Sequence, residues 1–343
     1  MPEAPRHILV RCPNPVGDAV MATPVLRALR SAHPHAEIAV LGPPQHAGLL
    51  RDVPTIDEYI PIAGRSLSAI WARARALRAR HFDWALILPD SPRTALEPLL
   101  AGIPRRAGYA RDALRRAMLT DALPTPRENG KRVAISMIER YRRITRALGV
   151  PDAEDALELV VHDPSRDRIA KQLANGGVGD APILLVTPGA SYGASKLWPP
   201  ARFAAACDGI AQRHGLVPVI LPAPNADELA IAQEVSALVE TRHLRIDTPG
   251  SLEDLKAMVE RSALLLTNDT GPRHVAVALD RPVITLMGPT DPRHTQHLLE
   301  RQRVLWEDVA CRPCGLKTCP IDHRCLTRLA PQRAIDAADE LLA

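Results

Sequence analysis

The sequence predicts an α/β protein of two Rossmann-like domains, whose parallel sheets face each other across a cleft. Short apolar runs typical of buried strands alternate along the chain with charged segments of helical spacing. This alternation favours parallel sheets covered by helices on both faces. A strand followed by a Pro/Gly-rich turn opens the chain at residues 8–10 and recurs at 183–186. With 343 residues, the chain is long enough for two domains.

The strands and helices are expected in the following order. The first half has strands at 8–10, 37–41 and 84–88, a helix that begins near Ala19, and a helix over 66–80. The second half has strands at 183–186, 217–221, 264–267 and 283–287, with helices over 202–214, 226–238 and 251–260. The polar segment 161–179 is expected to join the halves, giving domains 1–165 and 175–326 and a final helix within 330–343.

The composition is that of a soluble globular protein, with 46% apolar residues, 24% charged residues and a formal charge of +4. Aromatic residues make up 3%, too few for a nucleic-acid binder that stacks bases on rings. No apolar stretch is long enough to span a membrane, and the first residues lack a signal-peptide pattern. We therefore expect a cytoplasmic protein without a nucleic-acid partner.

The first candidate for chemistry is Asp18, in the loop PNPVGD that follows the first strand. Ligands of open α/β sheets bind beyond the carboxyl ends of the strands, where this loop would lie. The loop lacks the G-x-G-x-x-G pattern, which argues against a nicotinamide or flavin site. Asp18 either stabilises the first turn of the following helix or accepts a proton in the cleft.

The second candidate is the segment SYGASKLWP, which begins at Ser191 and contains Lys196. Small residues permit close approach of a ligand to the backbone, and a neighbouring lysine suits a diphosphate. The order of a P-loop is absent. An exposed loop lysine without a ligand is the alternative interpretation.

The third candidate is the turn of Asn268, Asp269, Thr270 and Gly271, where a buried strand ends and a helix begins near Pro272. Backbone amides at such a helix start bind anions. His274, one turn into the helix, could face the same ligand; a helix cap with a core histidine is the alternative. The segment GPTDP at 288–292 follows another strand and should reach the same rim.

The fourth candidate is a cysteine segment with four thiols in fifteen positions, at Cys311, Cys314, Cys319 and Cys325. Four thiolates satisfy tetrahedral zinc, although this spacing is not that of a zinc ribbon. A structural zinc, a reducible pair and four free thiols are all compatible with it.

Arginines gather in the first half of the chain, among them Arg93 and Arg111. Most would lie on solvated helix faces. Those that line the cleft would suit a phosphorylated or acidic acceptor, including one at an anionic membrane surface.

Four segments taken together resemble the ADP-heptose:lipopolysaccharide heptosyltransferases of glycosyltransferase family 9, and most of all the heptosyltransferase II subtype. They are PNPVGDAVMATPVLRALR from residue 13, SKLWP from 195, TNDTGPRHVAVALDRPVITLMGPTDP from 267 and CRPCGLKTCPIDHRC from 311. The resemblance implies the GT-B architecture, with the final helix packing back on the N-terminal domain. It implies inverting transfer of L-glycero-D-manno-heptose from ADP-heptose to the first heptose of the lipopolysaccharide inner core, at the inner face of the inner membrane.

The resemblance also assigns residues. Asp18 matches the general base, and Lys196 the lysine that binds the diphosphate. The remaining donor-site matches are Ser191, Asp269, Thr270, Gly271 and His274. The carboxylate that holds the ribose matches no single position; Ala226 occupies the ungapped match, with Asp227 and Glu228 just after it.

No cofactor is expected for this chemistry, since Lys196 and helix amides would stabilise the leaving diphosphate. Three other functions fit the same motifs. They are a heptosyltransferase I-like enzyme with another donor or acceptor, a nucleotide-sugar binding protein without activity, and a GT-B sugar-nucleotide epimerase.

Overall fold

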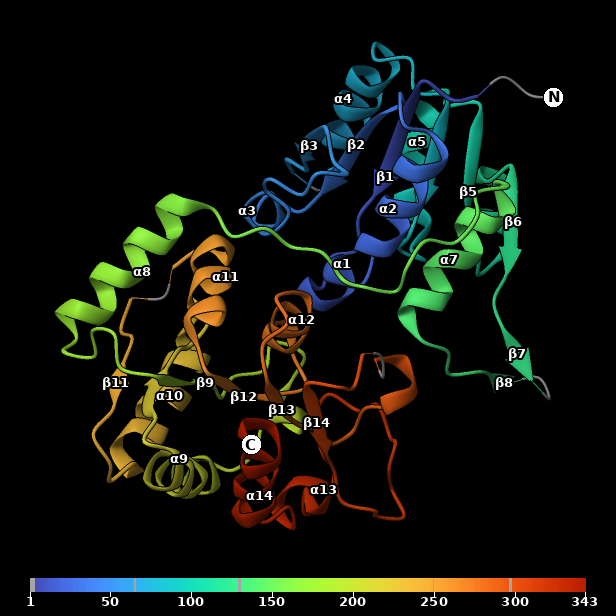
Figure 1. The fold of residues 1–343 in the computed structure, drawn as a ribbon. Coiled ribbons are helices and arrows are strands. Elements are labelled where there is room, and N and C mark those ends of the chain that lie inside the picture. Colours follow the sequence, from blue (N-terminus) through green and yellow to red (C-terminus); the bar gives the residue numbers. More distant parts are fainter. Residues whose placement is uncertain (1–3, 65, 129–130, 249, 296–297) are drawn as a thin grey trace. The chain divides into compact units, whose positions relative to one another are not determined.

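The computed structural model describes residues 4–64, 66–128, 131–248, 250–295 and 298–343. The chain divides into two compact units, Met1–Glu158 and Leu159–Ala343. Each unit is an α/β layer structure with its own parallel sheet and its own core (Figure 1).

The first unit contains a six-stranded sheet in the order β3-β2-β1-β4-β5-β6, and every neighbouring pair is parallel. The strands are β1 (His7–Arg11), β2 (Glu37–Gly42), β3 (Glu58–Pro61), β4 (Trp84–Ile87), β5 (Arg105–Ala110) and β6 (Asp121–Pro124). Leu9 in β1 aligns with Ala39 in β2 and with Ala85 in β4. The central strand β1 is buried over its last four residues, as expected when helices cover both faces.

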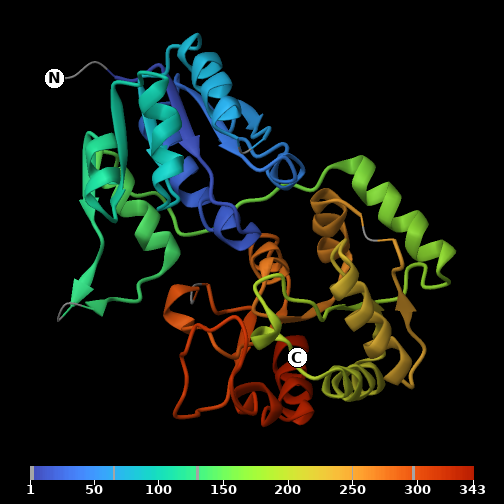
Figure 2. The same cartoon turned by 180° about the vertical axis from the view of Figure 1, so that it is seen from behind.

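Helices cover the two faces of this sheet (Figures 1 and 2). One face carries α2 (Thr23–Ala32) and α7 (Met137–Ala147), and the other carries α4 (Leu67–Arg78), α5 (Pro92–Leu100) and α6 (Ala113–Met118). Leu77, Ala95 and Met118 bring α4, α5 and α6 into one cluster with Leu9 and Ile87 of the sheet. The shorter elements are α1 (Val16–Val20), α3 (His46–Leu49), β7 (Arg127–Glu128) and β8 (Lys131–Arg132).

The second unit repeats this topology, in the order β11-β10-β9-β12-β13-β14. Its strands are β9 (Ile183–Thr187), β10 (Val217–Ile220), β11 (Leu244–Arg245), β12 (Leu264–Asn268), β13 (Val283–Leu286) and β14 (Gln302–Leu305). All neighbouring pairs are parallel. The strand order of both units is that of a Rossmann sheet. The predicted α/β fold with two Rossmann-like units is therefore confirmed.

The core of the second unit lies between its sheet and three helices. These are α9 (Pro200–His214), α10 (Ala226–Leu238) and α14 (Pro331–Leu342). Trp198 and Phe203 are fully buried in it, with their rings edge to face at 5.1 Å. The other elements are α8 (Asp163–Asn175), α11 (Leu252–Arg261), α12 (Gly271–Ala278), α13 (Arg324–Thr327), η1 (Ala194–Lys196) and η2 (Pro292–His294).

The structure differs from the expected domain organisation in one place. The segment expected to join the domains is the helix α8, which belongs to the second unit. Its buried residues Ser165, Ile169 and Leu173 recur every four residues and pack this helix against α11. Within the second unit, the final helix α14 packs against α9, β13 and β14, because Ala334, Ala337 and Ala338 complete its core. The expectation that this helix also packs on the N-terminal domain stays a prediction.

Across the described parts of the chain, no helix combines the length and the apolar character needed to cross a membrane.

A buried histidine lies near the end of β1. His46 is fully buried, and its Nδ1 lies 3.9 Å from the Sγ of Cys12. Burial, together with the nearby Arg11 guanidinium, lowers the pKa of His46 to about 4. The folded protein therefore holds this imidazole neutral, whereas the unfolded chain protonates it below about pH 6.5.

We predict that His46 makes the protein less stable as the pH falls. Between pH 6.5 and pH 4 only the unfolded state binds a proton at His46. The free energy of unfolding of wild type should therefore fall by about 3 kcal/mol relative to that of His46→Gln. Urea unfolding at pH 7 and pH 4 measures this difference, with the exposed His35→Gln as the control variant. A wild-type-minus-variant difference that is the same at both pH values would contradict a neutral buried His46.

Candidate active site

The candidate site of the second unit lies where two central strands end. β9 and β12 are neighbours, and the direction of the crossovers reverses between them. Ligands of open α/β sheets bind at this position, beyond the carboxyl ends of the strands. The Thr187 and Thr267 hydroxyls, near the ends of these two strands, are 2.6 Å apart in a buried hydrogen bond. The two loops that follow the strands therefore start from a fixed base.

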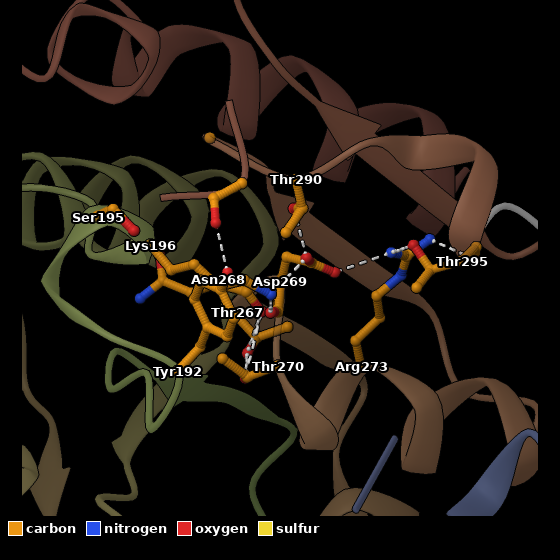
Figure 3. Close-up of polar contacts among 12 residues, drawn as sticks. Tyr192, Ser195, Lys196, Thr267, Asn268, Asp269, Thr270, Arg273, Thr290 and Thr295 are labelled. Atoms are coloured by element: carbon orange, nitrogen blue, oxygen red, sulfur yellow. Dashed lines mark hydrogen bonds and ion pairs between the residues drawn. The ribbon is translucent and has the colours of Figure 1, made fainter. Parts of the chain in front are cut away.

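Asp269, directly after β12, is the centre of a buried charge network (Figure 3). Its Oδ2 accepts hydrogen bonds from the Lys196 ammonium at 2.7 Å and from the Thr290 hydroxyl at 2.6 Å. Its Oδ1 lies 3.1 Å from Nη1 of Arg273, one helical turn further on. The side chains of Lys196, Asp269 and Arg273 are 11%, 5% and 1% exposed. We refer to Lys196, Asp269, Arg273 and Thr290 as the Asp269 network.

The Asp269 network keeps a positive charge at the site. Burial alone would raise the pKa of Asp269, but the Lys196 and Arg273 cations and the hydrogen bonds from Lys196 and Thr290 hold it well below its usual range. One carboxylate thus faces two cations, and one net positive charge remains. Lys196 Nζ gives two hydrogen bonds, to the carboxylate and the carbonyl of Asp269. An ammonium has a third donor, which can bind an anion.

The loop that carries Lys196 is held by buried hydrogen bonds from β12. The Asn268 side chain donates to the carbonyl of Pro188 at 2.6 Å and accepts from the backbone N–H of Trp198 at 3.2 Å. Gly193 has a φ of 152°, and a Cβ there would fall 2.5 Å from the carbonyl oxygen of Lys317. Only glycine suits that position. The loop conformation is therefore set by its own small residues and by Asn268.

The cysteine segment supports the same loop from the other side. Two backbone carbonyls of this segment accept hydrogen bonds from the loop. The Gly315 carbonyl accepts from Tyr192 Oη at 2.6 Å, and the Leu316 carbonyl accepts from Ser195 Oγ at 2.5 Å. The Tyr192 ring lies 5.0 Å from Lys196 Nζ and 5.9 Å from Lys317 Nζ. Two lysines thus flank one aromatic ring beside the Asp269 network, while Ser191 is exposed on the same loop.

The helix α12 begins beside Asp269, as predicted. Thr270 is its N-cap residue, Gly271 its first residue, and a proline occupies its first turn. The first amides of a helix have no partner within the helix and attract anions. His274, one turn into α12, is 4% exposed. The predicted GPTDP rim is also confirmed, since Thr290 contacts Asp269.

Glu228 occupies the first turn of α10, which follows β10. Of the three positions 226–228, it alone is buried. Its Oε2 accepts a hydrogen bond from the backbone N–H of Ala223 at 3.2 Å. A Cβ on Gly189 would fall 1.9 Å from the same oxygen. The Glu228 carboxylate therefore lies against the loop that follows β9.

Asp18 lies in the first unit, in the first turn of α1 directly after β1. It is half-buried between the buried residues Gly17 and Ala19. Burial and the Asp18 carboxylate raise the pKa of the Tyr141 phenol. Burial also raises the pKa of Cys12 to about 12, and Asp18 adds to this against the opposing effect of Arg11. Both neighbours therefore keep their protons at neutral pH. Arg93, in the first turn of α5, and Arg111, just before α6, are exposed.

The four clustered cysteines line one cavity of about 70 Å³ together with His323 and Leu316. All six cysteines of the chain are free thiols. Within the described ranges, no three His, Cys, Asp or Glu side chains are arranged to hold a metal ion. The structure thus does not support the structural zinc considered for Cys311, Cys314, Cys319 and Cys325. Burial and the neighbouring thiols raise the pKa of Cys325.

Several residues of the site were missed by sequence reasoning. Arg273 is four residues after Asp269, the spacing of a helical ion pair, and this signal could have identified it. Thr290 lies in the segment that was assigned only to the rim. Tyr192 and Lys317 come together through contacts between distant segments, and no local pattern indicates them.

Comparisons with protein families, curated sequences and solved structures all find proteins of one kind. The model of glycosyltransferase family 9 (heptosyltransferase) matches residues 70–324. The chain is 29% identical over 287 residues to lipopolysaccharide heptosyltransferase 2 of Salmonella typhimurium, and the aligned region covers 77% of each chain. Among solved structures, it resembles the ADP-heptose lps heptosyltransferase II of E. coli, with 28% identity and a TM-score of 0.81 over 98% of each chain. A family 9 glycosyl transferase from Veillonella parvula matches with 26% identity and a TM-score of 0.84, over 98% of this chain and 97% of that one.

We predict that Asp269→Asn strongly destabilises the second unit. Loss of the Asp269 carboxylate charge leaves the Arg273 guanidinium buried without compensation. The free energy of unfolding should fall by on the order of 3–5 kcal/mol. Urea unfolding measures this loss. The matched control is Asp280→Asn, because Asp280 pairs with Arg301 at 2.9 Å on the surface and exposed pairs contribute about 1 kcal/mol or less. Equal losses in the two variants would contradict the role of Asp269 as the centre of the network.

Proposed function

The chain belongs to glycosyltransferase family 9, the heptosyltransferase family, and on this basis we propose that it is a heptosyltransferase II-like enzyme. It transfers L-glycero-D-manno-heptose from ADP-heptose to the first heptose of the lipopolysaccharide inner core, with inversion at the anomeric carbon. The relatives named for heptosyltransferase 2 activity support this donor and acceptor. The Asp269 network, at the ligand-binding edge of the second unit, is the observation that carries the proposal.

The second unit binds the donor. The Lys196 ammonium and the first amides of α12, at Thr270 and Gly271, bind the diphosphate of ADP-heptose. Ser191 and His274 lie on the same two segments and complete this part of the site. Glu228 binds the ribose, since its buried carboxylate lies against the β9 loop. Asp269 has a different role, because both of its oxygens are used within the protein. It positions Lys196 and Arg273.

The same groups promote departure of the leaving group. When the bond between the anomeric carbon and the diphosphate breaks, negative charge grows on the phosphate oxygen. A buried ammonium and fixed helix amides stabilise that charge more than water does, since they need no reorganisation. The net positive charge of the Asp269 network therefore favours the transition state over the bound donor.

Asp18 of the first unit acts as the general base. It accepts the proton of the acceptor hydroxyl as that oxygen attacks the anomeric carbon, and one displacement inverts the centre. Two ionisable groups that interact with it, Cys12 and Tyr141, hold their protons at neutral pH. Asp18 itself is half-buried, so its carboxylate is accessible to an acceptor hydroxyl.

The acceptor is bound by the first unit, where the exposed Arg93 and Arg111 bind its anionic groups. Because the acceptor is a lipopolysaccharide, the enzyme works at the cytoplasmic face of the inner membrane as a peripheral protein.

Incubation with ADP-heptose and truncated core acceptors, followed by mass spectrometry of the products, tests the proposal. One added heptose on an acceptor that already carries the first heptose is the expected result. Addition to a heptose-free acceptor would indicate a heptosyltransferase I-like enzyme. Isomerised donor without acceptor would indicate an epimerase, and donor binding without turnover would indicate a binding protein.

We predict that Asp18→Asn lowers kcat by roughly 10²–10⁴-fold, the usual contribution of a general base. Donor affinity should stay near that of wild type, because the donor is bound by the other unit. Steady-state kinetics and calorimetry with ADP-heptose measure the two quantities. Glu154→Gln, at an exposed acid of the same unit, is the control. A kcat close to that of wild type would remove Asp18 from the mechanism.

We predict that Lys196→Ala weakens ADP binding by about ten- to a hundred-fold, the effect of losing one charge-assisted hydrogen bond. Isothermal titration calorimetry with ADP measures the change. Lys171→Ala removes an exposed lysine from α8 of the same unit and should bind ADP like wild type. Unchanged affinity in Lys196→Ala would exclude this lysine from the phosphate site.

A further inference from the structure

The first unit exposes large hydrophobic side chains on one side only. Among its described residues they are Leu67, Trp71 and Leu114, which are 69%, 61% and 62% exposed. Leu67 and Trp71 lie in the first two turns of α4, and Leu114 lies in the first turn of α6. Both helices cover the same face of the sheet, on either side of α5. Leu67 and Trp71 are one helical turn apart, and such neighbouring exposed apolar side chains indicate an interaction site.

These side chains lie at the edge of the sheet where Asp18 also lies. In a parallel sheet, every helix that follows a strand begins at the carboxyl edge. The helices α1, α4, α5 and α6 follow β1, β3, β4 and β5. Their first turns, which contain Asp18, Leu67, Arg93 and Leu114, therefore share one edge of the unit.

The α4 side chains form a single stripe. At 3.6 residues per turn, positions 67, 71, 75 and 78 fall within about 80° of one another around the helix axis. Leu67, Trp71, Arg75 and Arg78 are all exposed, whereas Ile70, Ala74 and Leu77 face the core. We define the docking surface as Leu67, Trp71, Arg75 and Arg78 of α4 with Leu114 and Arg116 of α6. Figure 2 shows α4 and α5 side by side on this face of the sheet.

The arginines of this surface differ from those on the opposite face of the sheet. All four arginines of α7 form ion pairs, Arg140 with Asp90, Arg142 with Asp155, Arg143 with Glu139 and Arg146 with Asp152. The segment 66–80 contains four arginines and no acidic residue. Two of them form ion pairs with other segments, Arg73 with Glu97, and Arg80 with Glu37 and Glu58. In the part of the chain that the structure describes, Arg75 and Arg116 form no ion pair with a carboxylate, and Arg78 donates to the backbone carbonyl of Leu100 at 2.6 Å. Carboxylates of α7 and of other segments thus balance the α7 arginines, whereas positive charge remains in excess on the docking surface.

We propose that the docking surface binds the headgroup region of an anionic lipid bilayer. Tryptophan and leucine enter the interface between headgroups and acyl chains, because their apolar parts leave water there. Arginines beside them are attracted to anionic lipid and can keep their guanidinium groups among the phosphates. The combination of exposed tryptophan, leucine and unbalanced arginine has the charge that complements such a surface. The inference rests on the proposed function and deepens it. Binding through this surface would bring the sheet edge that carries Asp18 to a lipid-anchored acceptor.

Vesicle binding tests the docking surface without donor or acceptor, so its result is independent of the transfer reaction. Wild type should sediment with vesicles that contain phosphatidylglycerol, less at high salt, and not with pure phosphatidylcholine. Arg75→Glu with Arg78→Glu should weaken binding by at least ten-fold, since each basic residue near the membrane contributes about five-fold. Leu67→Ser with Trp71→Ser should also weaken binding by about ten-fold or more.

Two matched double variants serve as controls. Leu229→Ser with Leu238→Ser removes exposed leucines of α10, and Lys171→Glu with Arg328→Glu reverses exposed charges of the second unit. Both should bind vesicles like wild type. A blue shift of tryptophan fluorescence on vesicle binding should disappear in Trp71→Phe while binding persists, which places Trp71 itself in the interface. Thermal unfolding of each variant checks that it is folded.

Three results would overturn the proposal. Wild type could fail to bind phosphatidylglycerol vesicles, or the docking-surface variants could bind like wild type. Alternatively, analytical ultracentrifugation could show a wild-type dimer that Leu67→Ser with Trp71→Ser dissociates, with vesicle binding unchanged. The last result would assign this face to a second copy of the chain.

Discussion

The buried carboxylate of Asp269 is the group on which the site of the second unit depends. It neutralises one of two cations that have left water, and it fixes both by direct hydrogen bonds. Without it, Lys196 and Arg273 would repel each other in a buried environment where charges are weakly screened. With it, the site retains a single positive charge at a defined place. A diphosphate needs such a charge, and the fold provides it where the carboxyl ends of β9 and β12 meet.

The surrounding segments maintain this arrangement. Asn268 holds the Lys196 loop through Pro188 and Trp198. The cysteine segment supports the loop through carbonyl groups, while Arg312 of that segment donates to the carbonyl of Gly288 at 2.8 Å, next to the turn that carries Thr290. The contribution of the cysteine segment that the structure shows is therefore mechanical support of the loops that carry Lys196 and Thr290. Its thiols lie around a small cavity and take no part in the Asp269 network.

The central strands could be predicted from the sequence, whereas the strands that were missed lie mainly towards the edges of the sheets. Strands buried on both faces are continuous apolar runs, as in β9 and β12, and such runs can be read directly. Edge strands such as β3 and β11 have polar neighbours and lack this signal. In β5, Arg105 and Arg106 conceal a strand, because Arg105 pairs with Asp121 and lies over the Trp84 ring. The polar helix α8 was interpreted as a linker for the same reason, since only three of its residues are buried.

For the site, sequence patterns identified Lys196 and Asp269 but could not show that they touch, since 73 residues separate them. That contact follows from the pairing of β9 with β12, a tertiary fact. The resemblance assigned Asp269 to the donor site, and the structure adds that its carboxylate oxygens contact Lys196, Arg273 and Thr290.

A crystal structure of the protein with ADP bound tests the central claim most directly. The account predicts a diphosphate oxygen within about 3 Å of Lys196 Nζ and of the first amides of α12, with the Asp269 network intact. Phosphates bound away from Lys196 and from the start of α12, with Lys196 in contact only with Asp269, would contradict it.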